Sequence, residues 1–309
     1  MSTSLFPDGG WDVHHYIFEP SRFPYDPNRH LTPPPATTKE YTDFKLKTGL
    51  TNSVLTHGRS YGADSTCLHT FTQDLDPSTT RSIALIDPET ITPTELADLH
   101  KNGVCGIRVN MYRYNAMHDV ELQKLALTSH SRALGGHVIV WGGVWRLRIH
   151  IRNFGILGRG IRLVTDHFAL LKGSSMLSDD SGTGVPEDGD GDVKVTKQAG
   201  FDDILDLVRS GHLFVKISAP YRVSTQAPYF QDLKPLARAL FDANPQQILW
   251  GSDWPHTPLM KVRKKYEAFK KTPYLEVDDM AWLRSLRSWL SDQEWKTLMV
   301  ENPQRLYDW

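Results

Sequence analysis

Histidine and aspartate side chains stand at the ends of three short apolar runs in this sequence. His14 lies within the run WDVHHYIF, His167 follows Asp166 at the end of IRLVTDH, and Asp253 ends QILWGSD. A carboxylate beside imidazoles can accept a proton from water, while the imidazoles orient that water or polarise a carbonyl group. We therefore predict that Asp253, His14 and His167 are catalytic, with Asp253 as the general base in an attack of water on an acyl carbon.

Other side chains near the ends of such runs are of the types that bind a small, flat, anionic molecule. A guanidinium group binds a carboxylate or an enolate-like oxygen through two parallel hydrogen bonds, and aromatic rings stack on conjugated rings. The predicted substrate-binding residues are Arg108, Arg222, Tyr16, His57, Tyr61, Tyr114, Trp141 and His256. For Arg108 the alternative is an ion pair in the protein interior.

Eight runs of β-branched and apolar residues alternate with helix-like segments, and they cover 11–18, 52–57, 81–87, 104–110, 137–143, 161–167, 213–218 and 247–253. A capping box formed by Thr92 and Glu95 opens one helix, and Ser291 with Glu294 caps the last one. Alternating buried strands and helices indicate a parallel sheet, and eight such units indicate a (β/α)8 barrel, an α/β fold of the TIM type. The alternative, a doubly wound open sheet, normally carries a glycine-rich loop after its first strand, and this chain has none there.

In such a barrel the carboxyl ends of the strands form one rim, where the active site lies. Four histidines, two arginines and an aspartate then converge on that rim, which favours a functional site over isolated core histidines. Alternation along the first strand predicts that Asp12, His14 and Tyr16 share one face and that His15 lies on the other.

The stretch GRSYG at 58–62 matches a nucleophile elbow with Ser60 as the nucleophile. An α/β-hydrolase, however, has several strands before its elbow, and only one complete strand precedes this run. We therefore do not expect Ser60 to be a nucleophile.

The composition excludes several classes of protein. The 309 residues carry 35 Lys and Arg against 36 Asp and Glu, which gives no electrostatic basis for nucleic-acid binding. No run approaches the roughly 20 apolar residues that cross a bilayer, and the start lacks a signal peptide, so we expect a cytoplasmic protein without a membrane partner. Cys67 and Cys105 are too few for a disulfide framework.

The expected partner is a small-molecule substrate with one anionic or carbonyl group, and the chain could form a homo-oligomer.

We expect one domain over residues 1–309. Three segments do not belong to the alternation of strands and helices. The proline-rich segment 18–38 is predicted to be a fixed loop across the barrel mouth, and the acidic, glycine-rich stretch 178–195 a solvated insertion. Arginines and a histidine alternate with apolar residues over 144–152, which is a strand pattern where the barrel needs a helix. The alternatives for this segment are an edge strand, an oligomer contact and, less favoured, an anion site.

Fragments over nearly the whole chain, FPYDPNR, TDH, VKISAPYR, WGSDWPH and ENPQRLY, resemble the 2-pyrone-4,6-dicarboxylate lactonase group of the amidohydrolase superfamily. The resemblance implies a (β/α)8 barrel and an enzyme that opens a lactone ring with water and without a metal. It matches His14 to the first histidine of the group's H-x-H motif, His167 to its strand-six histidine and Asp253 to its general base. Arg108 and Arg222 match arginines that hold substrate carboxylates.

Differences between this sequence and the lactonase group restrict the metal content and the substrate that we expect. Tyr16 replaces the second histidine of H-x-H, and Trp141 stands where many metal-dependent relatives keep a ligand. The remaining His14, His167 and Asp253 make a poor site for a divalent metal, so we expect no cofactor; the alternative is one zinc ion at these three residues. Positions where the lactonase contacts its two carboxylates read Leu31, Tyr114 and Leu170 here, and burying a second, unpaired carboxylate is costly.

The sequence thus predicts a metal-independent, lactonase-like hydrolase for a lactone or related cyclic ester of pyrone or aromatic type. The alternative within enzymes is a lyase or decarboxylase, an isomerase or a cyclase that acts on a conjugated aromatic or polyketide-like substrate in the same pocket, since one barrel family hosts several chemistries. A second alternative, suggested by Tyr16 and Leu170, is a binding protein derived from an enzyme.

Overall fold

Eight parallel strands form the centre of the protein. The structure, a computed structural model, describes residues 5–109, 116, 119–133, 139–142, 162–177, 195–258 and 265–307. Each strand pairs with the next in chain order, and they are β1 (Trp11–His15), β2 (Asn52–Thr56), β3 (Thr80–Ala84), β4 (Val104–Val109), β5 (Ile139–Gly142), β6 (Leu163–Thr165), β7 (Leu213–Ser218) and β8 (Ile248–Gly251). The predicted parallel α/β architecture with eight strands is confirmed.

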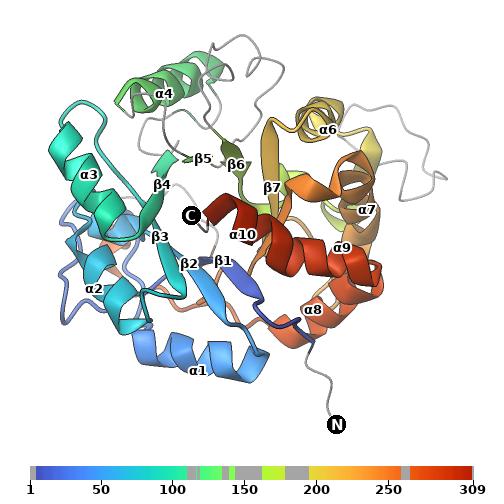
Figure 1. The fold of residues 1–309 in the computed structure, drawn as a ribbon, viewed down its shortest axis with the longest axis horizontal. Coiled ribbons are helices and arrows are strands. Elements are labelled where there is room, and N and C mark those ends of the chain that lie inside the picture. Colours follow the sequence, from blue (N-terminus) through green and yellow to red (C-terminus); the bar gives the residue numbers. More distant parts are fainter. Residues whose placement is uncertain are drawn as a thin grey trace.

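The end of β1 meets the segment that follows β8. Asp253 N donates to His14 O at 2.8 Å, and Tyr16 N donates to Trp254 O at 2.9 Å. The strands accordingly surround a common centre in Figure 1. This arrangement is the barrel type that the sequence predicted, and it brings the carboxyl ends of β1, β6, β7 and β8 near one another.

Helices cover the outside of the strands (Figure 1), and they are α1 (Thr38–Thr48), α2 (Thr66–Asp74), α3 (Pro93–Lys101), α4 (Val120–Ala133), α6 (Phe201–Arg209), α7 (Lys234–Ala243), α8 (Asp279–Ser288) and α9 (Asp292–Lys296). A further helix, α10 (Asn302–Tyr307), lies across one end of the barrel. Both predicted capping boxes are present, at Thr92 with Glu95 and at Ser291 with Glu294. Among the described residues, no helix is long and apolar enough to cross a membrane.

The amino end of the barrel is closed by apolar packing. Strand side chains such as Val13, Ile83 and Phe214 form one buried cluster, and Leu306 and Tyr307 of α10 complete it. Asn302 of α10 also donates to the carbonyl oxygen of Ile248 at 2.7 Å. Because this end is filled and covered, the polar side chains that could do chemistry are left at the carboxyl ends of the strands.

Strand β1 is irregular, and this corrects one expectation. The pairing of β1 with β2 shifts register between Asp12 and His15. Asp12 accepts a hydrogen bond from the Tyr41 hydroxyl at 3.0 Å, and the His15 ring stacks on the same Tyr41 at 3.6 Å between ring centroids. Asp12 and His15 therefore lie on the same side of the strand, toward α1, while His14 and Tyr16 contact each other on the other side. The prediction that Asp12 shares a face with His14 is wrong because the irregularity interrupts the alternation.

The proline-rich loop that follows β1 is attached by hydrogen bonds to other parts of the chain, and its predicted position across the barrel mouth stays a prediction. Phe18 and Ala36 exchange backbone hydrogen bonds of 2.8 Å, and Tyr274 donates to the Pro34 carbonyl oxygen at 2.5 Å. Ser60 is buried and donates to the Leu31 carbonyl oxygen at 3.0 Å. The GRSYG serine thus anchors this loop to the segment after β2.

Several predicted features lie outside the described residues. They are Tyr114, the side chain of Trp141, the alternating segment 144–152 and nearly all of the acidic stretch 178–195.

Candidate active site

Three buried side chains meet where β1, β6 and β8 end. Asp253 Oδ1 lies 3.4 Å from His14 Nε2 and 4.0 Å from His167 Nε2. The two imidazole rings are 5.2 Å apart between centroids. The structure therefore brings together the three residues that the sequence selected as catalytic, with the carboxylate facing both histidines.

The second oxygen of Asp253 is held by two donors. The Tyr221 hydroxyl donates to Oδ2 at 2.5 Å, and Arg222 donates to it through Nη2 at 2.8 Å and Nε at 3.2 Å. Burial would raise the pKa of Asp253, but the Arg222 guanidinium, with smaller contributions from His167 and His14, lowers it below its usual range. Oδ1 is buried and accepts no hydrogen bond from the described residues. The carboxylate is thus ionised, fixed through one oxygen and open to a proton donor at the other.

His14 is engaged at both ring nitrogens. Nδ1 lies 2.9 Å from Lys216 Nζ and 3.3 Å from Asp166 Oδ1, and Nε2 lies 2.8 Å from the Tyr16 hydroxyl. Burial lowers the pKa of His14, and the charge of Lys216 lowers it further against the opposing effect of Asp166. His14 is consequently a neutral imidazole at neutral pH.

Sequence reasoning missed Lys216, which lies in the middle of β7 and is completely buried. Its Nζ donates to the Val13 carbonyl oxygen at 2.8 Å and lies 3.4 Å from Asp166 Oδ1. Burial lowers the pKa of Lys216 to about 7, although Asp166 opposes this effect. The available signal was a lysine at the same alternation as Phe214 and Ser218 in the run LFVKIS, where a charged residue inside a buried strand needs a partner.

His167 is positioned by β7 and by an unusual backbone. Its Nδ1 lies 2.8 Å from Ser218 Oγ, and burial lowers its pKa to about 3, so this imidazole is neutral as well. The four residues His167–Leu170 all have φ between 53° and 60°, and Asp253 has a φ of 63°. Left-handed backbone costs non-glycine residues free energy and concentrates at functional sites. The candidate catalytic residues of β6 and β8 both stand on such backbone.

Arg222 and Arg108 have different surroundings. Arg222 binds Asp253 and donates to the Thr257 carbonyl oxygen at 2.9 Å, so in this structure it holds the candidate base. Arg108 lies over the Tyr16 ring, 5.5 Å from its centroid, and donates to the His57 carbonyl oxygen at 3.4 Å. No buried carboxylate within salt-bridge distance of Arg108 is found among the described residues. A substrate contact of either arginine stays a prediction.

Three other predicted binding residues are engaged in packing. His57 accepts a hydrogen bond from Leu85 N at 3.2 Å, and Tyr61 accepts one from Glu19 N at 2.7 Å. His256 Nε2 lies 3.0 Å from Asp279 Oδ2, and its ring packs edge-on against Tyr221. All three are buried, and His256 N also donates to the Asp253 carbonyl oxygen at 2.8 Å. A contact of these three residues with a substrate stays a prediction.

A metal ion does not fit the described residues well. His14, Asp166 and His167 offer ligand atoms within 4.8 Å of one another, a set that differs from the expected His14, His167 and Asp253. Two imidazoles and a carboxylate would suit zinc. Lys216 Nζ, however, lies 2.9 Å from His14 Nδ1 and 3.4 Å from Asp166 Oδ1, and Tyr16 occupies the other nitrogen of His14. A divalent cation there would face a lysine side chain at close range.

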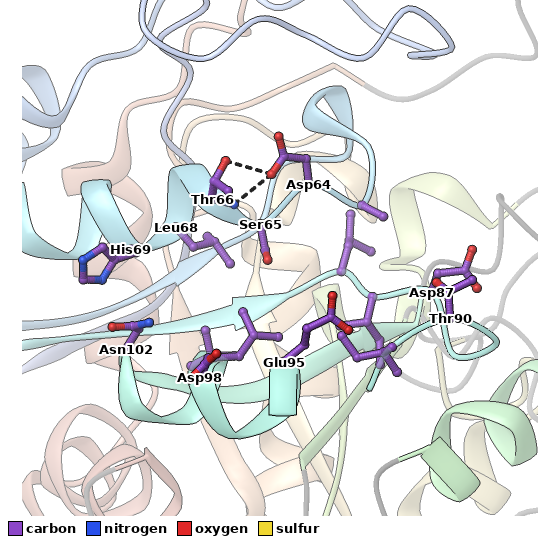
Figure 2. A pocket seen from close by; sticks show the side chains of 16 residues that line it. Asp64, Ser65, Thr66, Leu68, His69, Asp87, Thr90, Glu95, Asp98 and Asn102 are labelled. Atoms are coloured by element: carbon purple, nitrogen blue, oxygen red, sulfur yellow. Dashed lines mark hydrogen bonds between the residues drawn. The ribbon is translucent and has the colours of Figure 1, made fainter. Parts of the chain in front are cut away.

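Figure 2 shows a separate groove between α2 and α3, with a volume of about 620 Å³. Asp64 on its edge accepts hydrogen bonds from Thr66 N at 3.0 Å and Thr66 Oγ1 at 2.7 Å, and Glu95 belongs to the capping box of α3. None of the predicted site residues lines the groove. Asp64 and Glu95 serve the amino ends of α2 and α3, and the groove is not the candidate active site.

The comparisons with known proteins agree with this architecture. The model of the amidohydrolase family matches residues 11–309. The 4-sulfomuconolactone hydrolase of Hydrogenophaga intermedia is 28% identical over 98% of this chain and 90% of that protein. The 2-pyrone-4,6-dicarboxylate hydrolase of Comamonas testosteroni is 24% identical over 97% of this chain and 90% of that protein.

Solved structures show the same fold. A probable 2-pyrone-4,6-dicarboxylic acid hydrolase from Acinetobacter baumannii, solved with citric acid bound, aligns with a TM-score of 0.67 at 18% identity and covers 97% of this chain and 100% of that one. Because the family model spans nearly all of the sequence, the protein belongs to the amidohydrolase family and is an enzyme of the amidohydrolase superfamily, as the resemblance of its motifs indicated.

Proposed function

We propose that the protein opens the ring of a lactone or related cyclic ester with water, using Asp253 as the general base and no metal ion. One observation carries this proposal. Asp253 Oδ1 accepts no hydrogen bond from the described residues and faces His14 Nε2 at 3.4 Å and His167 Nε2 at 4.0 Å. A water molecule bound between these groups would have a proton acceptor on one side and two neutral imidazoles on the other.

The proposed reaction follows from the charge states of these residues. Asp253 is ionised because Arg222 stabilises the carboxylate, so it can take a proton from water over a wide pH range. The oxygen of that water bonds to the acyl carbon, and His14 and His167 orient the water or polarise the carbonyl oxygen. The ring C–O bond then breaks, and the leaving oxygen takes the proton back from Asp253. Lysine and tyrosine side chains surround His14 at the places where a metal would have to bind.

The proposed substrate carries one anionic or carbonyl group on a flat, conjugated ring. Arg108 lies at the edge of the site over the Tyr16 ring and has no buried carboxylate partner in the described part of the chain. Arg222 is already bound to Asp253, which leaves less charge for a second substrate anion. The names of two relatives, 4-sulfomuconolactone hydrolase and 2-pyrone-4,6-dicarboxylate hydrolase, denote enzymes for anionic lactones and support this substrate class. A cytoplasmic location and a homo-oligomeric state stay predictions from the sequence.

The test is turnover of a panel of pyrone and muconate-type lactones in water enriched with oxygen-18. Hydrolysis places one oxygen-18 atom in the carboxylate of each product, which mass spectrometry detects. Product without the label would show the alternative, a lyase, isomerase or cyclase reaction, and would refute hydrolysis. Enzyme-free incubations correct for spontaneous opening of each lactone.

Metal independence has its own test. Protein purified without a nickel column and dialysed against a chelator should keep its activity, and added zinc should not increase it. If the dialysed protein is inactive and zinc restores activity, the metal-free part of the proposal is wrong while the hydrolysis remains.

A further inference from the structure

Lys216 is the one lysine that the described structure places beneath the candidate active site. It belongs to β7 and is completely buried, and its Nζ lies close to several polar atoms. The Val13 carbonyl oxygen lies at 2.8 Å, His14 Nδ1 at 2.9 Å and Asp166 Oδ1 at 3.4 Å. Below its pKa of about 7, Lys216 is an ammonium group with three hydrogens and no lone pair, so in this form it can only donate a hydrogen bond.

Donation by Lys216 decides which nitrogen of His14 carries the hydrogen. A neutral imidazole has one nitrogen that carries a hydrogen and one that carries a lone pair. The nitrogen next to a hydrogen-bond donor carries the lone pair, and the nitrogen next to an acceptor carries the hydrogen. If Nδ1 accepts from Lys216, the hydrogen must be on Nε2. Nε2 lies 2.8 Å from the Tyr16 hydroxyl and 3.4 Å from Asp253 Oδ1, at the site where the substrate would react.

We propose that Lys216 is a positioning residue that keeps His14 in the tautomer with its hydrogen on Nε2. In catalytic terms this inference rests on the proposed function. It assigns His14 as a hydrogen-bond donor to the carbonyl oxygen of the lactone, where negative charge develops when water attacks. His14 in this tautomer cannot accept a proton from water at Nε2, so Asp253 is left as the base.

The competing arrangement is visible in the same structure. His14 Nδ1 lies 3.3 Å from Asp166 Oδ1, and a hydrogen on Nδ1 could be donated to that carboxylate. This contact is longer than the 2.9 Å contact between His14 Nδ1 and Lys216 Nζ. The two arrangements put the hydrogen on opposite nitrogens, so a single measurement separates them.

The measurement is the nitrogen-15 NMR spectrum of histidine side chains in the full-length wild-type protein at pH 6, below the pKa of Lys216, with His14 assigned by its loss in His14→Gln. We expect the signals of His14 to show a protonated Nε2 and an unprotonated Nδ1. A protonated Nδ1 in the wild type overturns the proposal without any need for a variant or a substrate.

Lys216→Met then tests whether the lysine is the cause. Methionine has a similar length and no donor, so His14 should change to the tautomer that donates from Nδ1 to Asp166. Lys47→Met, at an exposed position on α1, is the matched control and should leave the His14 signals unchanged. If Lys216→Met folds and His14 keeps its hydrogen on Nε2, the lysine does not set the tautomer and the proposal fails. If this variant does not fold, the double variant Lys216→Met with Asp166→Asn, which removes the charge left without a partner, is measured in its place.

Kinetics of the folded variant test the catalytic consequence. With a lactone that the wild type hydrolyses, kcat of Lys216→Met should fall by about 100-fold or more while KM changes little, as when an oxyanion donor is lost. A variant with a changed tautomer and unchanged kcat would overturn the positioning role. If the wild type hydrolyses no lactone, the proposed function fails, but the NMR result still decides the tautomer.

Discussion

The two sides of the strand-end rim are built from different interactions. On the side of β6, β7 and β8, buried charges are paired with one another, and the pairs join Asp253 with Arg222 and Asp166 with Lys216. On the side of β2, β4 and the loop after β1, aromatic rings pack together, with Phe18 lying 5.9 Å from Tyr16 and 6.2 Å from Tyr61 between centroids. We call the first group the charged side and the second the aromatic side.

Backbone strain follows the same division. Non-glycine residues with positive φ at the strand ends of the described chain include His167, Ala219 and Asp253, all on the charged side. Strained backbone persists only where the surrounding contacts determine it, and it fixes the direction of a side chain. The comparison therefore suggests that the charged side positions groups for reaction and that the aromatic side, with Arg108, positions the substrate.

Replacing the candidate base should give the largest effect. Asp253→Asn removes the proton acceptor, and we expect kcat to fall by about 1,000-fold or more, within the range for loss of general acid–base catalysis. Steady-state kinetics with a lactone substrate measures this. The asparagine also leaves Arg222 without its counter-ion, so urea unfolding must show that the variant is folded under the assay conditions. A folded, fully active variant would show that Asp253 is not the base, and the role assigned to the charged side would be wrong.

Arg108→Met should give the next largest effect, and of a different kind. If the aromatic side binds the substrate, loss of the guanidinium should raise KM for an anionic lactone by about 30-fold and leave kcat nearly unchanged, since a hydrogen bond to a charged group is worth about 2 kcal/mol. A lactone without an anionic group should show little change. Arg81→Met is the matched control, because Arg81 donates to the Pro77 carbonyl oxygen, away from the site. An equal loss in kcat would place Arg108 with the reacting groups instead.

Local patterns made much of the fold predictable. Eight apolar runs mark the eight strands, and the capping boxes at Thr92 and Ser291 involve residues only three positions apart. The strand-end positions of His14, His167 and Asp253 follow from the same rhythm, because parallel strands all end at one rim. The register irregularity in β1 could not be predicted, since alternation assumes regular pairing, and Asp12 was placed on the wrong face for that reason.

The pairing of charges was the part of the site that the sequence did not show. Arg222 is a credible substrate clamp when taken alone, but its position next to Asp253 depends on how the segments after β7 and β8 approach each other in space. The run LFVKIS has the nearly continuous apolar pattern of a buried structural strand, so the pattern alone does not assign Lys216 to the site. A charged residue at an inward position of such a strand indicates a buried partner, and here that partner is Asp166.

Tyr221→Phe should give a smaller, pH-dependent effect on the charged side. The tyrosine hydroxyl donates to Asp253 Oδ2 at 2.5 Å, so its removal should raise the pKa of Asp253, although Arg222 continues to lower it. Activity requires the ionised carboxylate, and the fall in kcat/KM at acid pH should therefore begin at a pH about one unit higher than in the wild type. The pH profile of kcat/KM measures the change. An unchanged acid limb would show that Tyr221 does not tune the base.

The smallest effect is expected at His15, which follows His14 in β1 and faces α1. His15 is buried against Tyr41, its two ring nitrogens have no hydrogen-bond partner in the described structure, and burial lowers its pKa well below the usual value. The unfolded chain takes up a proton at this residue near pH 6.5 and the folded chain does not, so stability is complete above that pH and declines as the pH falls. His15→Phe should remove this pH dependence. The free energy of unfolding of the variant minus that of the wild type should therefore be about 2 kcal/mol larger at pH 5 than at pH 7. Urea unfolding at the two pH values measures the difference, and kcat should not change, because neither side of the rim includes His15. An identical pH dependence in both proteins would mean that His15 is protonated in the fold, and a lower kcat would mean that the outer face of β1 contributes to the charged side.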